Sequence, residues 1–171
     1  SYPPIRLQIA VQGGTVLEFR VEKREAFPIL GLSFPLRSHI EENFRIVPQM
    51  WEQAAAEGTL ARLAAQMDGT PQGLLGVSLC QDSQPWRYYI AVASSQPPGP
   101  WEAYTVPAST WAIFPGRGPA SGIQQLERRI ITEWLPTSGY EYADAPDLEV
   151  YQNPDPRDAQ YEIWIPVAPK P

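Results

Sequence analysis

The fold is decided by Leu148-Glu149-Val150-Tyr151 and, after a polar loop, by Tyr161-Glu162-Ile163-Trp164-Ile165-Pro166-Val167. Both segments alternate between apolar and polar residues and are rich in β-branched and aromatic side chains. This pattern predicts two β-strands joined as a hairpin.

The two faces of this hairpin differ in character. Successive side chains of a strand point to opposite faces, so Glu149 and Tyr151 share one face, opposite Val150. On the second strand we expect Glu162 and Trp164 on the Glu149 face. An acid among aromatic residues is typical of a binding-site wall, although a solvated face with a surface glutamate fits the same pattern.

Composition excludes several classes of function. The 171 residues suffice for one ordinary domain or two small ones, and the formal net charge of −6 argues against a nucleic-acid surface, which needs basic patches. Cys80 is the only cysteine and His39 the only histidine. A disulfide within the chain, a cysteine-rich metal site and a histidine-based triad are therefore excluded, and we predict no metal and no cofactor.

The distribution of apolar residues along the chain bears on membrane insertion and on cellular localisation. The sequence has no run of about 18 apolar residues, so we expect no membrane span. No signal peptide is visible, and we expect a cytoplasmic protein. The six tryptophans and eight tyrosines suit both a packed core and an aromatic ligand pocket.

The chain contains an internal repeat. Residues 26–93 and residues 109–168 each give a strand, a helix and a hairpin, and their last strands align so that Tyr89 matches Trp164. Each unit has too little core to stand alone, so the two should join edge to edge. The predicted fold is α+β: two pseudo-twofold-related strand–helix–strand–strand units form an antiparallel sheet, with helices on one face and a ligand groove on the other.

The helices are predicted from their periodicity. Apolar residues recur at helical spacing from Ile46, which places Pro48 in a first helical turn, where proline is tolerated. A second main helix is expected over residues 121–135, ending before Pro136. Residues 1–18 are expected to be a leader, with a possible edge strand at residues 5–9 and a break at Gly13-Gly14.

Four stretches together resemble the GyrI-like, or effector-binding, domain family. They are Ala26-Phe27-Pro28-Ile29-Leu30-Gly31-Leu32-Ser33, Glu133-Trp134-Leu135-Pro136-Thr137-Ser138-Gly139-Tyr140-Glu141, and the two strands quoted at the outset. The resemblance covers residues 19–168 and implies a domain over residues 19–171. It also implies a fold of paired strand–helix–strand–strand units, in agreement with the repeat.

The resemblance implies a role for Glu149. In multidrug-sensing members of the family, a glutamate on a central groove strand pairs with cationic, aromatic ligands, and Glu149 matches it by motif position. A carboxylate in an apolar wall is costly to desolvate, and a lipophilic cation offsets that cost by charge pairing. Aromatic faces add cation–π attraction of about 0.5–2 kcal/mol each.

Seven further residues are candidates for the same ligand site. Tyr151 and Trp164 are predicted to form its walls because they share the parity of Glu149. Core packing explains the remaining aromatic candidates equally well, and a rim, solvent-exposed or capping role is the alternative for the acids. The five remaining candidates are the aromatic residues Tyr89, Trp111 and Phe34 and the acids Glu162 and Glu133. Trp51 and Trp134 lie on helical stripes and are expected in the core.

The leader points to a transcription factor. Pro4-Ile5-Arg6-Leu7-Gln8-Ile9 with Gly13-Gly14, followed by Glu18-Phe19-Arg20-Val21-Glu22-Lys23, resembles the segment after the helix-turn-helix region of AraC-type regulators. The resemblance implies a C-terminal sensor domain that meets DNA only through a domain absent from these residues.

Two other function classes remain open. Some GyrI-like proteins hydrolyse small electrophilic compounds with an acid and aromatic groups of the same groove, and others bind and inhibit DNA gyrase. We expect a non-enzymatic sensor of lipophilic, cationic aromatic compounds.

Overall fold

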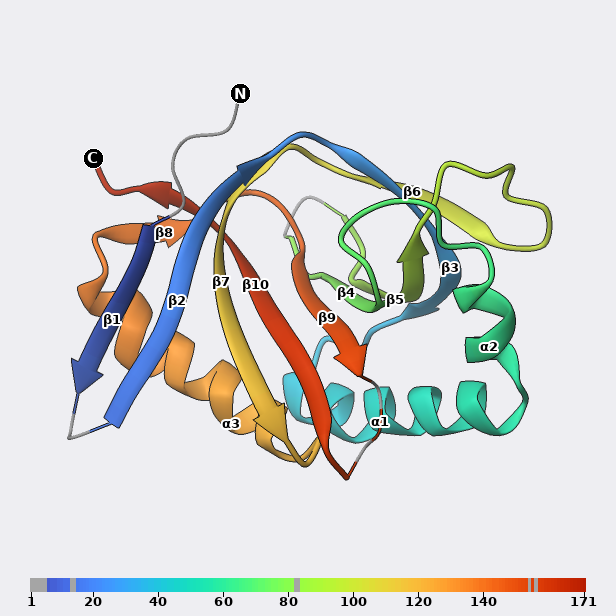
Figure 1. Ribbon diagram of the computed structural model, residues 1–171, viewed down its shortest axis with the longest axis horizontal. Coiled ribbons are helices and arrows are strands. Elements are labelled where there is room, and N and C mark those ends of the chain that lie inside the picture. The colour runs from blue at the N-terminus through green and yellow to red at the C-terminus, as the bar shows by residue number, and fades with distance from the viewer. Residues whose placement is uncertain (1–5, 13–14, 82–83, 154, 156) are drawn as a thin grey trace.

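The computed structural model describes residues 6–12, 15–81, 84–153, 155 and 157–171 (Figure 1). The strands are β1 (Arg6–Gln12), β2 (Thr15–Arg24), β3 (Phe27–Pro35), β4 (Leu74–Leu79), β5 (Arg87–Ala93), β6 (Glu102–Val106), β7 (Ser109–Gly118), β8 (Tyr140–Tyr142), β9 (Asp147–Asn153) and β10 (Ala159–Pro169). The helices are α1 (Ile40–Ala56), α2 (Thr59–Ala64) and α3 (Gly122–Arg129), and α3 continues into a π-helical turn (Ile130–Trp134) and a 3-10 turn (Leu135–Thr137).

The strands form one antiparallel sheet in the order β1-β2-β7-β10-β9-β4-β5-β3-β6, with β8 paired to β10. The triplets β7-β10-β9 and β3-β5-β4 have the same internal order and meet where β9 pairs with β4. The predicted α+β fold of two repeated units is therefore confirmed.

The leader contributes to the sheet. β1 pairs with β2 at the sheet edge, which agrees with the edge strand expected there, and β2 begins at Thr15, inside the predicted leader. The predictions for residues 1–5 and for the break at Gly13-Gly14 lie outside the described residues.

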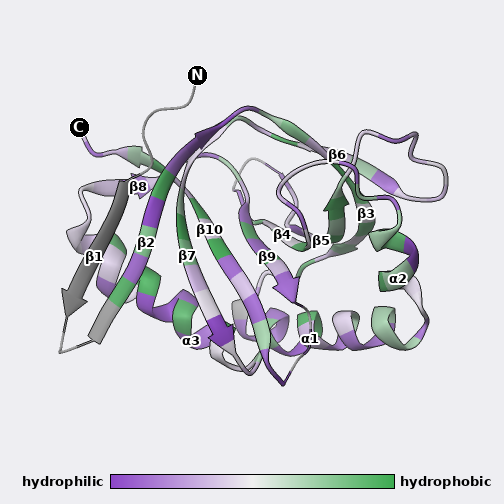
Figure 2. Cartoon of the chain, viewed as in Figure 1, coloured by the Kyte–Doolittle hydropathy of each residue, from purple (hydrophilic) through white to green (hydrophobic). Residues whose placement is uncertain are grey.

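The two faces of the sheet are covered differently. On one face, here called the helix face, Ile130 and Trp134 pack against strand residues such as Phe114, and Ala54 packs near Ile90. Both α1 and α3 lie on the lower side of the sheet in Figure 1. The other face, the helix-free face, carries a core cluster to which no residue of α1, α2 or α3 contributes. Figure 2 shows the corresponding alternation of hydrophobic and hydrophilic residues along β2.

The helix around Pro48 begins earlier than predicted. It starts at Ile40, which leaves Pro48 inside the helix rather than in its first turn. Glu41 and Glu42 occupy the first turn, where negative charge interacts favourably with the helix dipole. Proline removes the hydrogen bond to the carbonyl of Phe44, and because Phe44 is exposed, water can satisfy that carbonyl.

The register of β9 and β10 overturns one prediction about faces. Ile163 lies opposite Glu149, whereas Trp164 lies opposite Leu148, so Trp164 does not share the face of Glu149. The cause is a register shift between Gln160 and Tyr161. A single extra residue in one strand moves every later side chain to the other face relative to the partner strand.

Candidate functional site

Glu149 lies on β9, in the middle of the sheet, and its side chain is on the helix face. The hydroxyl of Tyr88 donates to its Oε1 at 3.1 Å, and the hydroxyl of Tyr151 donates to its Oε2 at 2.9 Å. Glu149 and Tyr151 therefore share a face, as the strand parity predicted, and they are also hydrogen-bonded to each other. We predicted the groove on the face opposite the helices, and the carboxylate lies instead on the helix face.

A glycine on the neighbouring strand makes room for this arrangement. Gly76 of β4 lies directly opposite Glu149. A Cβ at position 76 would overlap the hydroxyl of Tyr88 and lie 2.8 Å from Glu149 Oε1. The missing side chain thus permits the Tyr88–Glu149 hydrogen bond.

Helix α1 contributes Trp51 to the same cluster. Its indole Nε1–H donates to the Tyr88 oxygen at 2.8 Å, and its ring meets that of Tyr151 edge to face at 5.0 Å. Trp51 was expected in the core, and it does pack against buried residues while staying partly exposed. One hydrogen-bond chain therefore runs from Trp51 through Tyr88 to Glu149.

A second acid approaches from α3. Burial together with the charge of Glu149 raises the pKa of Glu127 to about 9. Burial also raises the pKa of Glu149, against the lowering effect of its hydroxyl donors. Burial raises the pKa of Asp147, two residues before Glu149 on β9, to about 7.

These acids have no basic partner among the ion pairs of the described residues. The five ion pairs involve Arg20 twice, Arg117, Arg129 and Arg157, and none includes Glu127, Asp147 or Glu149. Glu127, Asp147 and Glu149 all remain partly accessible to solvent. The helix face therefore carries a half-buried acidic site bordered by aromatic rings, which suits a positively charged, apolar ligand.

Three predicted aromatic residues lie on the other side of the sheet. Trp164, Trp111 and Tyr89 belong to the core of the helix-free face. The rings of Trp111 and Trp164 are 5.7 Å apart, and Tyr89 stacks on Tyr104 at 5.4 Å. The sheet thus separates them from Glu149, and they pack the interior.

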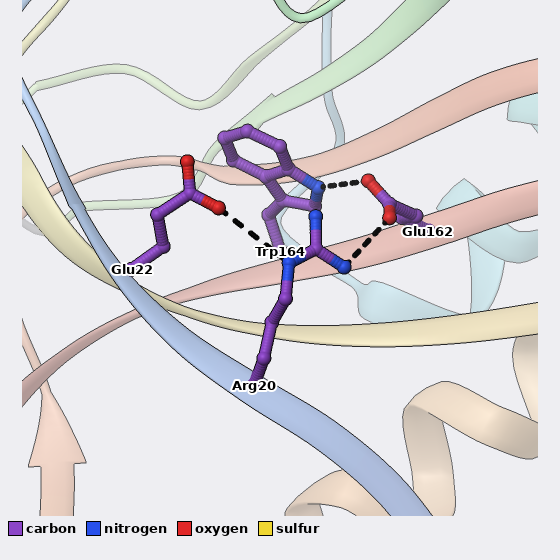
Figure 3. A network of polar contacts seen from close by, with 4 residues as sticks. All are labelled: Arg20, Glu22, Glu162 and Trp164. Atoms are coloured by element: carbon purple, nitrogen blue, oxygen red, sulfur yellow. Dashed lines mark hydrogen bonds and ion pairs between the residues drawn. The ribbon is translucent and has the colours of Figure 1, made fainter. Parts of the chain in front are cut away.

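The remaining predicted residues have other contacts. Phe34 lies opposite Tyr88 on the neighbouring strand and is half-buried against the cluster around it, and Glu133 pairs with Arg129 at 2.8 Å. Glu162 accepts hydrogen bonds from Arg20 at 2.9 Å and from Trp164 Nε1 at 3.1 Å (Figure 3). The contacts of Glu162 and Glu133 are thus structural.

Sequence reasoning missed Tyr88, Glu127 and Gly76. Glu127 carries the clearest signal, because it lies four residues after Ile123 and three before Ile130, within an otherwise buried helical stripe. An acid on such a stripe is unusual unless a partner or a ligand meets it. Tyr88 was passed over for its neighbour Tyr89, which points to the opposite face.

The described part of the chain was also searched for metal-ion clusters and for membrane-spanning helices. It contains no group of three histidine, cysteine, aspartate or glutamate side chains placed to hold a metal ion. None of its helices is long and apolar enough to cross a membrane.

Comparison with known proteins finds one matching family model. The family model of the GyrI-like small molecule binding domain matches residues 17–168. No curated protein matches the sequence significantly.

Several solved structures share the fold. SAV2435 bound to tetraphenylphosphonium has a TM-score of 0.77 and 20% sequence identity, over 89% of this chain and 94% of that chain. A putative transcription regulation protein from Staphylococcus aureus MU50 has a TM-score of 0.72 and 21% identity, over 88% and 98%. The EcmrR C-terminal domain has a TM-score of 0.60 and 13% identity, over 90% and 99%.

Proposed function

This chain belongs to the family of GyrI-like small-molecule-binding domains, and we propose that it binds lipophilic, cationic aromatic compounds at Glu149. The observation that carries the proposal is the Glu149 carboxylate, which two tyrosine hydroxyls hold in place while no described basic side chain pairs with it. The carboxyl group therefore has a fixed position, and its ionised form has no basic partner among the described residues.

Electrostatics favours a cation over a neutral ligand. Burial raises the pKa of Glu149, which means that the surroundings disfavour its charged form. A cation in contact with the carboxylate would supply the missing counter-charge, and its own desolvation cost falls if the charge is spread over an apolar body. The rings of Trp51 and Tyr151, 5.0 Å apart, would add cation–π attraction of about 0.5–2 kcal/mol each.

A structural neighbour supports this ligand class. SAV2435 is bound to tetraphenylphosphonium, a cation whose charge is enclosed by four phenyl rings. The proposed site comprises Glu149 and Tyr151, as expected from the sequence, together with Tyr88 and Trp51. Phe34 packs beside Tyr88 and supports the site. We do not include the other sequence candidates, because their contacts are with the core of the helix-free face or with arginines.

Calorimetric titration of the protein with tetraphenylphosphonium tests the proposal. We expect one bound cation per chain, with an affinity that falls little at high salt because salt screens a partly buried charge pair less than an exposed one. Absence of binding at millimolar concentrations of the cation would contradict the proposal.

The ligand signal is proposed to serve transcription regulation. Support comes from the shared fold of the EcmrR C-terminal domain and of the Staphylococcus aureus protein. In this proposal the domain acts in the bacterial cytoplasm as an effector sensor of the AraC-type class, and DNA is bound by a separate domain. The complete reading frame of the gene tests this: a helix-turn-helix region upstream is expected.

We further propose that the domain binds its ligand without chemical turnover. Burial and the charge of Glu149 raise the pKa values of Tyr88 and Tyr151 well above their ordinary range, so both hydroxyls stay protonated and are poor nucleophiles at neutral pH. We expect no protein-dependent hydrolysis of a lipophilic nitrophenyl ester, followed by absorbance. Hydrolysis that is lost in Glu149→Gln would contradict this expectation and favour the hydrolase class.

A further inference from the structure

A cleft at the edge of the helix-free face lies apart from the proposed cation site. It has a volume of about 290 Å³ and lies where the end of β2 and the start of β3 meet the loop after α2 and the end of β5. Its apolar lining includes Phe27 and Ala93, two members of the core of the helix-free face. Glu149 points to the other face of the sheet and does not line this cleft. The cleft is therefore a candidate site for a second ligand.

One wall of the cleft presents a positively charged group that is held in place. The guanidinium carbon of Arg24 lies 5.5 Å from the ring centroid of Phe27 and 5.3 Å from that of Trp164. Its Nη2 donates to Thr70 Oγ1 at 2.7 Å. Arg24 takes part in none of the five ion pairs among the described residues. A guanidinium has several N–H donors, and the hydrogen bond to Thr70 occupies only one of them, so Arg24 can still bind an anionic group.

The lining of the cleft also carries negative charge. Asp68 accepts hydrogen bonds from the backbone N–H of Ser95 at 2.9 Å, from the Ser95 hydroxyl at 3.0 Å and from the side-chain amide of Gln96 at 3.1 Å. These donors are neutral, so they fix the carboxylate without cancelling its charge. Glu25, an exposed residue, adds a second acid to the lining. A simple anion would be repelled by both acids, whereas a molecule that also carries a positive charge would be attracted to them.

We propose that this cleft binds a small zwitterion, a molecule with one carboxylate and one ammonium group, as in a free amino acid. The ligand's carboxylate accepts hydrogen bonds from Arg24, whose planar guanidinium matches the geometry of a carboxylate, and its ammonium group meets the carboxylate of Asp68. The volume of about 290 Å³ is at the lower end of the range for ligand pockets, which restricts the ligand to a small molecule. The rings of Phe27 and Trp164 hold the guanidinium in position before the ligand arrives, which lowers the entropic cost of binding.

A series of ω-amino acids tests the proposal by NMR. The ¹⁵N-labelled protein is titrated with glycine, 4-aminobutyrate and 6-aminohexanoate, which carry the same two charges at increasing separation. Butyrate and butylammonium each carry one of the charges and serve as controls. We expect saturable shifts of the Arg24 Nε–H signal and of the backbone amides of Gly69 and Thr70. At least one amino acid of the series should bind roughly fivefold or more tightly than either control, as one additional charge pair implies.

Substitutions assign the two charges to their residues. Arg24→Gln and Asp68→Asn each remove one charge, and each is expected to weaken binding of that amino acid by roughly fivefold or more. Arg24→Lys keeps the charge and should bind more tightly than Arg24→Gln. Arg45→Gln, which removes an exposed arginine on α1, is expected to leave the affinity unchanged.

Four outcomes would overturn this inference. They are the absence of saturable shifts for every amino acid of the series at millimolar concentrations, equal affinity for butyrate alone, unchanged affinity in either Arg24→Gln or Asp68→Asn, and loss of the shifts when tetraphenylphosphonium saturates the protein. The last outcome would place the amino acid in the Glu149 site. Failure of the protein to bind tetraphenylphosphonium would contradict the proposed function and leave this inference standing, because the two sites lie on opposite faces of the sheet.

Discussion

Replacing Glu149 by glutamine is expected to weaken tetraphenylphosphonium binding by roughly 30- to 4000-fold, which corresponds to about 2–5 kcal/mol. Glutamine keeps the shape of the side chain, and its carbonyl oxygen can still accept from the hydroxyl of Tyr88 or of Tyr151. The loss would therefore report the charge that faces the ligand rather than a change in packing. Titration calorimetry at pH 8 measures the effect.

The matched control removes an acid of the same kind from the surface. Glu52→Gln changes an exposed residue on α1, next to Trp51, and is expected to leave the affinity unchanged. Circular dichroism should show the same folded state for both variants. If Glu149→Gln binds as tightly as the wild type, the carboxylate is solvated and does not anchor the ligand.

Replacing Gly76 by alanine is expected to reduce both stability and ligand affinity. The new methyl group would overlap the hydroxyl of Tyr88, which is 1% exposed and hydrogen-bonded on both sides, so the phenol must shift. Overpacking of this kind costs about 1–3 kcal/mol of folding free energy. Displacement of Tyr88 also breaks the hydrogen bond that positions Glu149, and we expect at least about a tenfold loss of affinity. Urea denaturation and cation titration give the two values.

A second substitution distinguishes this clash from a general effect of side chains in β4. Tyr88→Phe removes the hydroxyl that the methyl group meets, so the double variant Gly76→Ala/Tyr88→Phe should be less destabilised than the two single effects predict. Gly69→Ala serves as the control, because its methyl group would meet Ala93 only at ordinary contact distances of 3.6 Å and beyond. Additive effects of the two substitutions at positions 76 and 88 would show that Gly76 does not act through Tyr88.

The repeat could be predicted from the sequence because each of its strands and helices has a recognisable local pattern of apolar and polar residues. Each half shows its strand, helix and hairpin through hydrophobic periodicity, and two units without a sufficient core have to join. The pairing of β9 with β4 completes the sheet in the way this requirement implies. Glu149 and Tyr151 also lie together because residues two apart on a strand share a face.

The side of the sheet on which Trp164 lies could not be predicted in the same way. The shift between Gln160 and Tyr161 moves the register of β10 by one residue relative to β9. The alternation of apolar and polar residues in the two strands gives no sign of this shift. One such irregularity exchanges the faces and separates Trp164 from Glu149.

The other members of the site come together only through tertiary structure. Trp51 and Tyr88 belong to elements far apart in the sequence, and they are hydrogen-bonded because α1 lies over the face of the sheet that carries Glu149. The position of Glu127 on a buried helical stripe was the one local indication. The need for a glycine at position 76 depends on Tyr88 of the neighbouring strand and is likewise invisible in local sequence.

The central claim is that negative charge on the helix face selects the ligand. Tetraphenylphosphonium and tetraphenylborate have nearly the same size and shape and carry opposite charges, so the ratio of their dissociation constants for the wild-type protein isolates the charge. We predict that the phosphonium binds at least about 100-fold more tightly than the borate, since the borate would face the carboxylate of Glu149 with like charge. Equal affinities, or tighter binding of the borate, would contradict the account.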